Sequence, residues 1–298
     1  MARNGRGLRR LCRLLGYTPQ AYYSYGKQLV KGGLKEDLLL QQVVICRNRQ
    51  PRLGCRKLLV KLEGFMQAHA ISIGRDAFFE LLRANGLLLR RRRRNKPLTT
   101  LSHHRYKKYT DLVKGYIPDR PCALWVSDIT YVPSGRGFAY LSLVTDAYSR
   151  KIVGYHLGEG LQSEGPLTAL KMAINNEKWA HQSLIHHSDR GVQYCSLGYT
   201  ALLQASNIRI SMTQSGDPRD NAIAERVNGI LKQELLKGYY TDIATARRSV
   251  AEAVETYNHH RPHSSVNMLT PDQAHRCSGP LIRKWKNYYT AKEVMMSG

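Results

Sequence analysis

The sequence predicts a mixed α/β domain, in which a five-stranded sheet is flanked by helices, preceded by small all-α helix-turn-helix domains. Three observations lead to this prediction. Helical patterns separated by turn residues fill the first third of the chain. From Ala123 onward, short β-branched and aromatic runs alternate with helical patterns, which is typical of a sheet covered by helices. The net charge is also concentrated in the first third of the chain. Residues 1–115 contain 26 Lys and Arg and six Asp and Glu, a net charge of +20, whereas the whole chain has a net charge of +24.

The composition limits the classes of protein to which the chain can belong. With 298 residues and 42% hydrophobic content, it can bury a full-sized core. The basic first third favours an anionic partner, either nucleic acid or a membrane surface. No apolar run reaches the roughly 20 residues that span a bilayer, and the N-terminus has no secretory signal pattern. We therefore expect a protein of the cytoplasm or nucleoid, with no membrane partner.

The cysteines are scattered and form no Cys-x-x-Cys pair, which favours reduced thiols over a disulfide framework. The same pattern excludes an N-terminal zinc domain built on paired cysteines. The six positions are Cys12, Cys46, Cys55, Cys122, Cys195 and Cys277.

The first helical unit is predicted over residues 1–33. A helical pattern from Leu8 to Leu15 ends at Gly16. Thr18 then offers an N-cap, and Pro19 begins a second helix that we expect to run to about Gln28. This outline indicates a helix-turn-helix.

A second unit of the same kind is predicted over residues 34–95. Gly54 to Leu62 is basic and amphipathic, and Gly64-Phe65 is expected to break that helix. Arg75 to Asn85, closed by Gly86, is the candidate recognition helix, with Arg75 as a candidate DNA contact. Each unit taken alone also fits a plain helical bundle with a solvated cationic face. Two such units in so basic a segment favour DNA binding.

A run of five arginines follows, and it leads into a polar, basic linker predicted over residues 96–118. Charge runs of this kind usually form extended arms that track phosphates. The candidate phosphate contacts are Arg90, Arg91, Arg92, Arg93 and Arg94.

The α/β domain is predicted over residues 119–240. Three strands with tight connections, at Leu124 to Val132, Phe138 to Thr145 and Ile152 to Leu157, indicate an antiparallel meander. The remaining elements then alternate. We expect helices at Ser163 to Asn176, Leu197 to Ser206 and Asn221 to Leu236, strands at Ser183 to His187 and Ile208 to Met212, and a last helix at Ile243 to Tyr257 within a C-terminal segment, 241–298.

Three carboxylates come from three separate elements of this domain. Asp128 lies in the middle of the first strand, where a charge among apolar neighbours is costly unless it is paired. Asp189 follows the strand that ends at His187, at the sheet edge where α/β folds commonly form ligand sites. Glu225 lies in the first turns of the long helix. The three side chains can converge only at that sheet edge.

Converging carboxylates suit hard cations, since Mg²⁺ and Mn²⁺ prefer oxygen ligands and share them with substrate phosphates. Two such ions about 3.5 to 4 Å apart can activate a water or a 3′-hydroxyl and stabilise the leaving oxygen. We therefore expect Asp128, Asp189 and Glu225 to hold two Mg²⁺ ions, with Mn²⁺ as a substitute.

Several stretches together resemble the DDE transposases of the insertion sequence three family, over about residues 8 to 275. The acids Asp189 and Glu225 have 35 residues between them, which is the spacing of the family signature. The stretches are Leu124 to Tyr131, Val144 to Arg150, His187 to Tyr194, Asp220 to Glu225 and the closing Tyr257 to His263.

The resemblance implies an RNase H-like core in which Asp128, Asp189 and Glu225 are the catalytic acids. It also implies double-stranded DNA partners, namely transposon ends and target, joined through attack by a 3′-hydroxyl, and a homo-oligomer on DNA at the bacterial nucleoid. In many relatives an upstream reading frame supplies another helix-turn-helix and a coiled coil. This chain has no sustained heptads, so an upstream-frame partner is a further expectation.

Other polar residues near these motifs have structural interpretations. Asp146 fits a turn between strands, and Asp217 and Asp220 fit caps or first-turn charges of the long helix. The histidines at 186, 187 and 259 to 263 can bind metal or shuttle protons, but packing or phosphate contacts are preferred because the carboxylates already supply oxygen ligands.

Helix geometry adds two candidate DNA contacts. Lys232 is seven residues after Glu225, about 700° of rotation, and therefore lies on nearly the same helix face. Asn228, three residues after Glu225, lies on that face as well. The functional interpretation is contact with the DNA end, and the alternative is a solvated surface.

Three other functions remain as alternatives to a transposase. An RNase H-like nuclease would cut DNA without joining it. A tyrosine recombinase, suggested by the 18 tyrosines, would need no metal and would form a covalent phosphotyrosine. A DNA-binding regulator would carry a decayed catalytic domain, although all three acids are present.

Overall fold

A computed structural model describes residues 4–16, 18–89, 105–135, 137–177, 183–214 and 221–281. The chain divides into two compact units. The first comprises Met1–Arg49 and Leu53–Arg90, and the second Gln50–Arg52 and Arg91–Gly298. No helix in the described ranges combines the length and the apolar character needed to cross a membrane.

The first unit contains four helices: α1 (Asn4–Leu14), α2 (Pro19–Arg49), α3 (Cys55–Ala68) and α4 (Arg75–Ala84). Gly16 has a positive φ of 74° after α1, and the Thr18 hydroxyl accepts the Ala21 N–H at 3.1 Å, as the predicted cap requires. The start of α2 and the bounds of α4 therefore follow the prediction.

Two predicted helix ends are wrong. The second helix does not end near Gln28 but continues to Arg49, so the predicted boundary between residues 33 and 34 falls inside α2. Likewise, α3 continues through Gly64 and Phe65 to Ala68. A glycine costs only about 1 kcal/mol in a helix relative to alanine, and packing of an apolar face outweighs that cost. The buried apolar cluster of this unit comprises Leu39, Val43, Leu53, Cys55, Leu58, Leu62, Phe78 and Leu82.

The second unit is built on a five-stranded sheet in the order β3-β2-β1-β4-β5. The first three strands form the predicted antiparallel meander, and β4 and β5 run parallel to β1. This order confirms the predicted RNase H-like mixed sheet. The strands are β1 (Leu124–Ser134), β2 (Gly137–Asp146), β3 (Ile152–Gly158), β4 (Ile185–Ser188) and β5 (Arg209–Met212).

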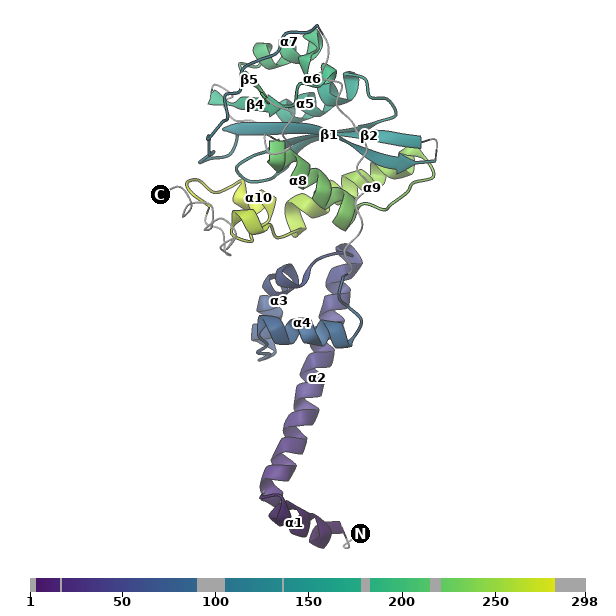
Figure 1. Ribbon diagram of the computed structural model, residues 1–298, viewed down its shortest axis with the longest axis vertical. Helices are drawn as coiled ribbons and strands as arrows, with labels where there is room; N and C mark the ends of the chain where they lie inside the picture. Colours follow the sequence, from purple (N-terminus) through teal and green to yellow (C-terminus); the bar gives the residue numbers. More distant parts are fainter. Residues whose placement is uncertain are drawn as a thin grey trace, which may run out of the picture. The chain divides into compact units, whose positions relative to one another are not determined.

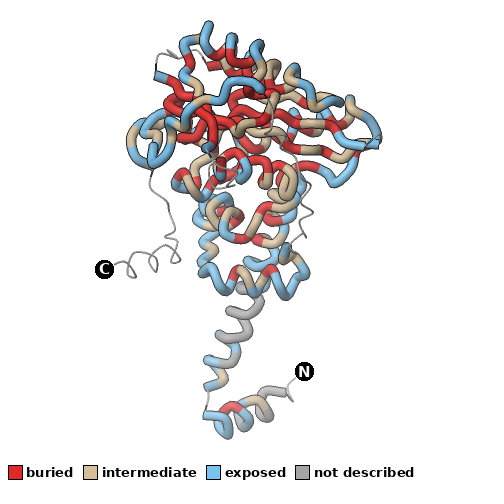
Figure 2. The backbone as a smooth tube through the Cα atoms, turned by 45° about the horizontal axis from the view of Figure 1, so that its top comes forward, coloured by how far each residue is buried: buried red, intermediate tan, exposed pale blue. Residues whose placement is uncertain are grey.

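Helices cover both faces of the sheet (Figure 1). One layer contains α5 (Glu164–Asn176), α6 (Val192–Cys195) and α7 (Leu197–Ala205). The other contains α8 (Ala222–Ile230), the π-helical turn η3 (Leu231–Leu235) and α9 (Ile243–Glu255). Both apolar layers pack against the strands, and Figure 2 shows buried residues concentrated along them.

The segment after α9 packs into this same unit, so the predicted boundary between residues 240 and 241 does not separate two cores. It comprises the π-helical turn η4 (Thr256–His260), the 3₁₀ turn η5 (Ser264–Val266) and the short helix α10 (Pro271–Ala274).

Polar groups of the Tyr257 to His263 stretch attach this segment to the sheet. The Asn258 amide accepts the Ile152 N–H at 3.0 Å and donates to the Ile152 carbonyl at 2.9 Å. The buried Arg261 donates to both carboxylate oxygens of Glu234, each at 2.8 Å. Within the described residues, this motif therefore has a structural role.

Candidate active site

Asp128 lies in the middle of β1, half-buried, on the strand face that packs against α8. On that face, Leu124 and Val126 share an apolar cluster with Ala224 of α8. The Asp128 carboxylate accepts two neutral donors, the Ile129 N–H at 2.9 Å and the Asn228 amide at 2.7 Å. Burial raises the pKa of Asp128, and the charges of Asp189 and Glu225 raise it further, to about 7 despite these hydrogen bonds.

The strand register brings Asp189 beside Asp128. The last parallel pair between β1 and β4 is Val126 with His187, and each acid lies two residues beyond its member of that pair. Because side chains alternate along a strand, both acids emerge on the same side at neighbouring positions. The Gly191 N–H then donates to Asp189 Oδ1 at 2.9 Å. A Cβ on Gly191 would lie 2.9 Å from that oxygen, so a larger residue there would displace the Asp189 carboxylate.

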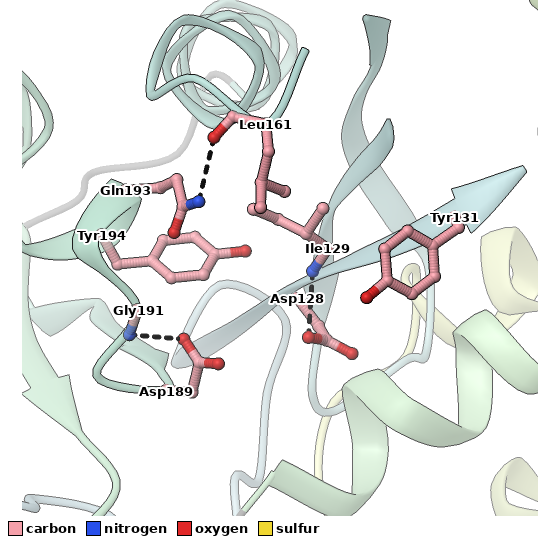
Figure 3. A pocket seen from close by; sticks show the side chains of 8 residues that line it. All are labelled: Asp128, Ile129, Tyr131, Leu161, Asp189, Gly191, Gln193 and Tyr194. Atoms are coloured by element: carbon pink, nitrogen blue, oxygen red, sulfur yellow. Dashed lines mark hydrogen bonds between the residues drawn. The ribbon is translucent and has the colours of Figure 1, made fainter. Parts of the chain in front are cut away.

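A pocket opens over these two acids (Figure 3). Figure 3 shows the carboxylates of Asp128 and Asp189 between the rings of Tyr194 and Tyr131. The Tyr194 hydroxyl is buried and has no hydrogen-bond partner within the described ranges. The lining residues are Asp128, Ile129, Tyr131, Leu161, Asp189, Gly191, Gln193 and Tyr194.

Glu225 lies in the first turn of α8 and is exposed to solvent. It is not among the residues that line the pocket, but its charge acts on Asp128 and contributes to the raised pKa of that acid. The structure therefore brings all three predicted acids to one corner of the sheet. They come from β1, from the end of β4 and from α8.

Asn228 and Lys232 follow Glu225 on the face that packs against β1. Four residues of a helix rise by about 6 Å, and two residues of a strand by about 6.6 Å. Residues four apart on the helix can therefore face residues two apart on β1. Asn228 therefore meets Asp128, and the Lys232 ammonium donates to Thr130 Oγ1 at 3.2 Å. That ammonium also lies 5.8 Å from the centroid of the Tyr131 ring.

The two predicted DNA contacts on this helix thus differ. Asn228 is buried and is hydrogen-bonded to Asp128, so the alternative of a solvated surface is wrong for it, and its DNA contact stays a prediction. Lys232 is only half-buried, at the margin of the site. Burial lowers the pKa of Lys232, and the charge of Asp128 opposes this effect.

A neutral polar network lies beneath the site. His186 Nε2 is 2.7 Å from the Ser127 hydroxyl and 2.9 Å from the Tyr199 hydroxyl. Complete burial lowers the pKa of His186 to about 3, with a smaller contribution from His187. His187 is also buried and contacts the Ser211 hydroxyl. Both histidines are packing residues, and their burial excludes phosphate contacts.

The remaining candidates lie elsewhere. Arg75 is exposed on α4, in the helical unit, and pairs with Asp76. Asp146 is fully buried and accepts the Cys122 and Ser149 N–H groups, consistent with its predicted turn. The run Arg90 to Arg94, Asp217 and Asp220 lie outside the described residues.

Sequence reasoning missed the two aromatic walls of the pocket. The one-turn helix α6, which begins directly after Gly191, brings Tyr194 back over the acids. A glycine two residues after a candidate metal ligand was the available signal. Tyr131 lacked such a signal, because its place depends on how η3 packs.

Comparisons with known proteins find similarity to integrase core domains and to proteins of insertion sequences. Models of an integrase core domain match residues 118–218 and 206–271. The Insertion element IS600 uncharacterized 31 kDa protein of Shigella sonnei is 30% identical, over 88% of this chain and 96% of its own length. Transposase InsF for insertion sequence IS3A, from Escherichia coli K12, is 28% identical over 89% and 93%. The magnesium-bound catalytic core of HTLV-2 integrase is 19% identical over 53% of this chain and 98% of that one, with a TM-score of 0.42.

Proposed function

Because this chain belongs to the insertion sequence three family of DDE transposases, we propose that it nicks the terminal inverted repeats of its element and joins the 3′-hydroxyl ends to target DNA. The observation that carries this proposal is the gathering of Asp128, Asp189 and Glu225 from three elements at one corner of the sheet. Joining by direct attack of a hydroxyl needs no protein nucleophile.

Members of this family use divalent metal ions, and the acids of this site fit Mg²⁺. They offer only oxygen ligands, which Mg²⁺ and Mn²⁺ prefer. Asp128 and Asp189 repel each other, and the hydrogen bonds to Asp128 come from neutral groups, so an added cation relieves the repulsion. Asp128, Asp189 and Glu225 would hold two ions. When bound, these ions supply Lewis acid stabilisation of the phosphate and activation of the attacking hydroxyl.

The chain's own residues fix the ligands in place. The Asn228 amide orients Asp128, and the Gly191 N–H orients Asp189. The aromatic rings of Tyr131 and Tyr194 narrow the pocket over both acids. The Lys232 ammonium, held beside Thr130, contacts a phosphate next to the scissile bond. Each group acts by positioning, which is how phosphoryl transfer is mainly catalysed.

The basic segments supply binding to the DNA ends. Arg75 on α4 contacts DNA from the helical unit, and Arg90 to Arg94 contact phosphates along the arm. Binding to phosphates releases counterions, so affinity falls by about 0.9 log units per contact for each tenfold rise in salt. The protein acts at the bacterial nucleoid as a homo-oligomer, with an upstream-frame protein as a further partner.

A strand-transfer assay tests this function. The full chain is incubated with Mg²⁺ or Mn²⁺, labelled duplexes that carry candidate insertion-sequence ends, and a target plasmid. We expect joined products with ends at the 3′-hydroxyl of the repeat, and none after chelation with EDTA. Matched duplexes with scrambled ends are the control for recognition.

The alternatives predict other products in the same assay. A nuclease leaves cut ends without joined DNA, and a DNA-binding regulator leaves the duplex intact. A tyrosine recombinase remains covalently attached to DNA and works in EDTA. Any of these outcomes would replace the proposal.

A further inference from the structure

A second group of side chains that can bind a metal lies at the start of β1. Cys122 precedes β1, Glu177 follows α5, and His275 follows α10. One ligand atom from each lies within 4.8 Å of the other two, and all three residues are buried. Cys122 is six residues from Asp128 along an extended chain, about 20 Å, so this cluster is separate from the catalytic acids.

The spacing of the ligand atoms fits a tetrahedral ion. Glu177 Oε2 lies 3.1 Å from His275 Nε2 and 4.0 Å from Cys122 Sγ. Around tetrahedral zinc, with bonds of about 2.0 Å to oxygen and nitrogen and about 2.3 Å to sulfur, these separations are about 3.3 Å and about 3.5 Å. The first separation already matches, the second must shorten by about 0.5 Å, and the third pair, Cys122 and His275, lies within 4.8 Å.

Surrounding side chains orient two of the ligands. His275 Nδ1 lies 2.9 Å from the Ser149 hydroxyl and 3.7 Å from the buried Asp146 carboxylate. Metal-bound histidines usually hold their other ring nitrogen in this way. Lys151 Nζ lies 3.2 Å from Glu177 Oε1, which leaves Oε2 directed at His275.

The chemistry of the donors selects the metal. A thiolate, an imidazole and a carboxylate suit zinc, whereas Mg²⁺ prefers oxygen ligands alone. Zinc with one thiolate, one carboxylate and one neutral imidazole has no net charge, which suits a buried position. We propose that Cys122, Glu177 and His275 bind one zinc ion, with a water molecule as the fourth ligand.

Binding is an exchange of cations without electron transfer. The zinc ion replaces two protons, one from the Cys122 thiol and one from the His275 imidazolium, and both protons pass to solvent. The ion links positions that are 55 and 98 residues apart in the chain. It therefore fixes the segment after α10 to the start of the strand that carries Asp128, and it stabilises the folded unit.

Metal binding by the full-length protein tests this site. The protein is stripped with a chelator and then equilibrated with zinc in the presence of excess Mg²⁺, which occupies the oxygen-only site. We expect one zinc per chain to be retained and the melting temperature of the catalytic unit to rise by about 5 to 10 °C at a hundredfold excess over Kd. Cobalt in place of zinc should give a thiolate-to-cobalt charge-transfer band.

Variants then assign the ligands. Cys122→Ser and His275→Gln should each weaken zinc binding at least about 100-fold and remove the cobalt band, and Ser149→Ala should weaken it about 10-fold. Cys195→Ser is the matched control, since it removes another buried thiol, and its zinc binding should equal that of the wild type.

The proposal is overturned if the stripped wild type retains no zinc, or if Cys122→Ser binds zinc as the wild type does. The first result would show a metal-free cluster in which a protonated His275 bridges Glu177 and Asp146, and the second would show that the zinc is bound elsewhere. The zinc count and melting shift of the wild type decide the question even if a variant fails to fold.

Discussion

Two carboxylates, one in contact with the stretch from α8 through η3 and one within it, have opposite electrostatic surroundings. On the side facing β1, Asp128 receives neutral donors while Asp189 and Glu225 repel it. On the side facing η4, Glu234 binds the guanidinium of Arg261 through both oxygens. A carboxylate that is paired with a positively charged side chain stabilises the folded protein. A carboxylate held among like charges lowers the stability of the fold, and under the proposed function a metal ion would offset this cost.

The largest expected effect concerns the repelled acids. Asp128→Asn, Asp189→Asn and Glu225→Gln should each lower the joining rate by about 10³-fold or more, because metal ligands contribute several kcal/mol to the transition state. DNA binding should remain nearly intact. The joining rate of preformed protein–DNA complexes in Mg²⁺ measures the loss.

The same variants should not destabilise the metal-free protein, since each removes a repelling charge. For Asp128→Asn we expect a melting temperature equal to or above that of the wild type. A large drop would mean that Asp128 has a structural role like that of Glu234, and the contrast between the two environments would fail. Near-normal joining by any one variant would remove its residue from the ligand set.

Loss of the cation that pairs with Glu234 should lower the stability of the protein, in contrast to the variants of the repelled acids. Arg261→Ala removes a buried guanidinium and leaves the half-buried Glu234 without its cation, and we expect a loss of about 3 kcal/mol in the free energy of unfolding. Denaturant titration of the catalytic unit measures this loss. The double variant Arg261→Met with Glu234→Leu should recover most of it, because no charge is then left buried.

The next prediction is that the joining reaction depends on the ammonium group of Lys232 in particular. Lys232→Ala should lower joining by about 10-fold to 150-fold, since a charge-assisted contact contributes about 1.5 to 3 kcal/mol. Lys232→Arg should retain part of the activity. Lys237, exposed beyond the end of η3, is the control for general charge. Equal defects in Lys232→Ala and Lys237→Ala would refute a specific contact.

The effect that appears only on acidification concerns the neutral network beneath the acids. Because burial lowers the pKa of His186 to about 3, the unfolded chain takes up a proton below the ordinary value of 6.5 and the folded chain does not. The resulting stability is fully present above pH 6.5 and is lost as the pH falls toward 3, by about 1.4 kcal/mol per pH unit.

The variant His186→Asn lacks this proton uptake, so it provides the reference. The difference in unfolding free energy between wild type and variant should be constant above pH 6.5 and should shrink between pH 6.5 and 5. A difference that does not change with pH would mean that His186 titrates alike in both states.

The sequence predicted the strands, their antiparallel meander and the three acids, because alternation and motif spacing are local signals. It did not predict that β4 pairs with β1, although this pairing places Asp189 beside Asp128. Helix geometry put Asn228 on the face of Glu225 but did not indicate what that face contacts. Glycine was weighted too strongly as a helix end, because packing of α2 and α3 was not visible.

The cluster of Cys122, Glu177 and His275 was beyond such reasoning altogether. Its members are far apart in the chain, and none belongs to a Cys-x-x-Cys or His-x-x-His pattern. Single residues that lie close in space but far apart in the chain produce no periodic pattern in the sequence. Only the folded topology, which brings the ends of α5 and α10 to the start of β1, places them together.

The amide of Asn258 has a consequence for how copies of this protein meet. At an open sheet edge, unpaired N–H and C=O groups can pair with a strand of another molecule and seed aggregation. At the first residue of β3, Asn258 occupies both backbone groups of Ile152, and the nearby Tyr257 hydroxyl donates to the Arg150 carbonyl. Strand exchange between neighbours is therefore blocked at this point of the edge.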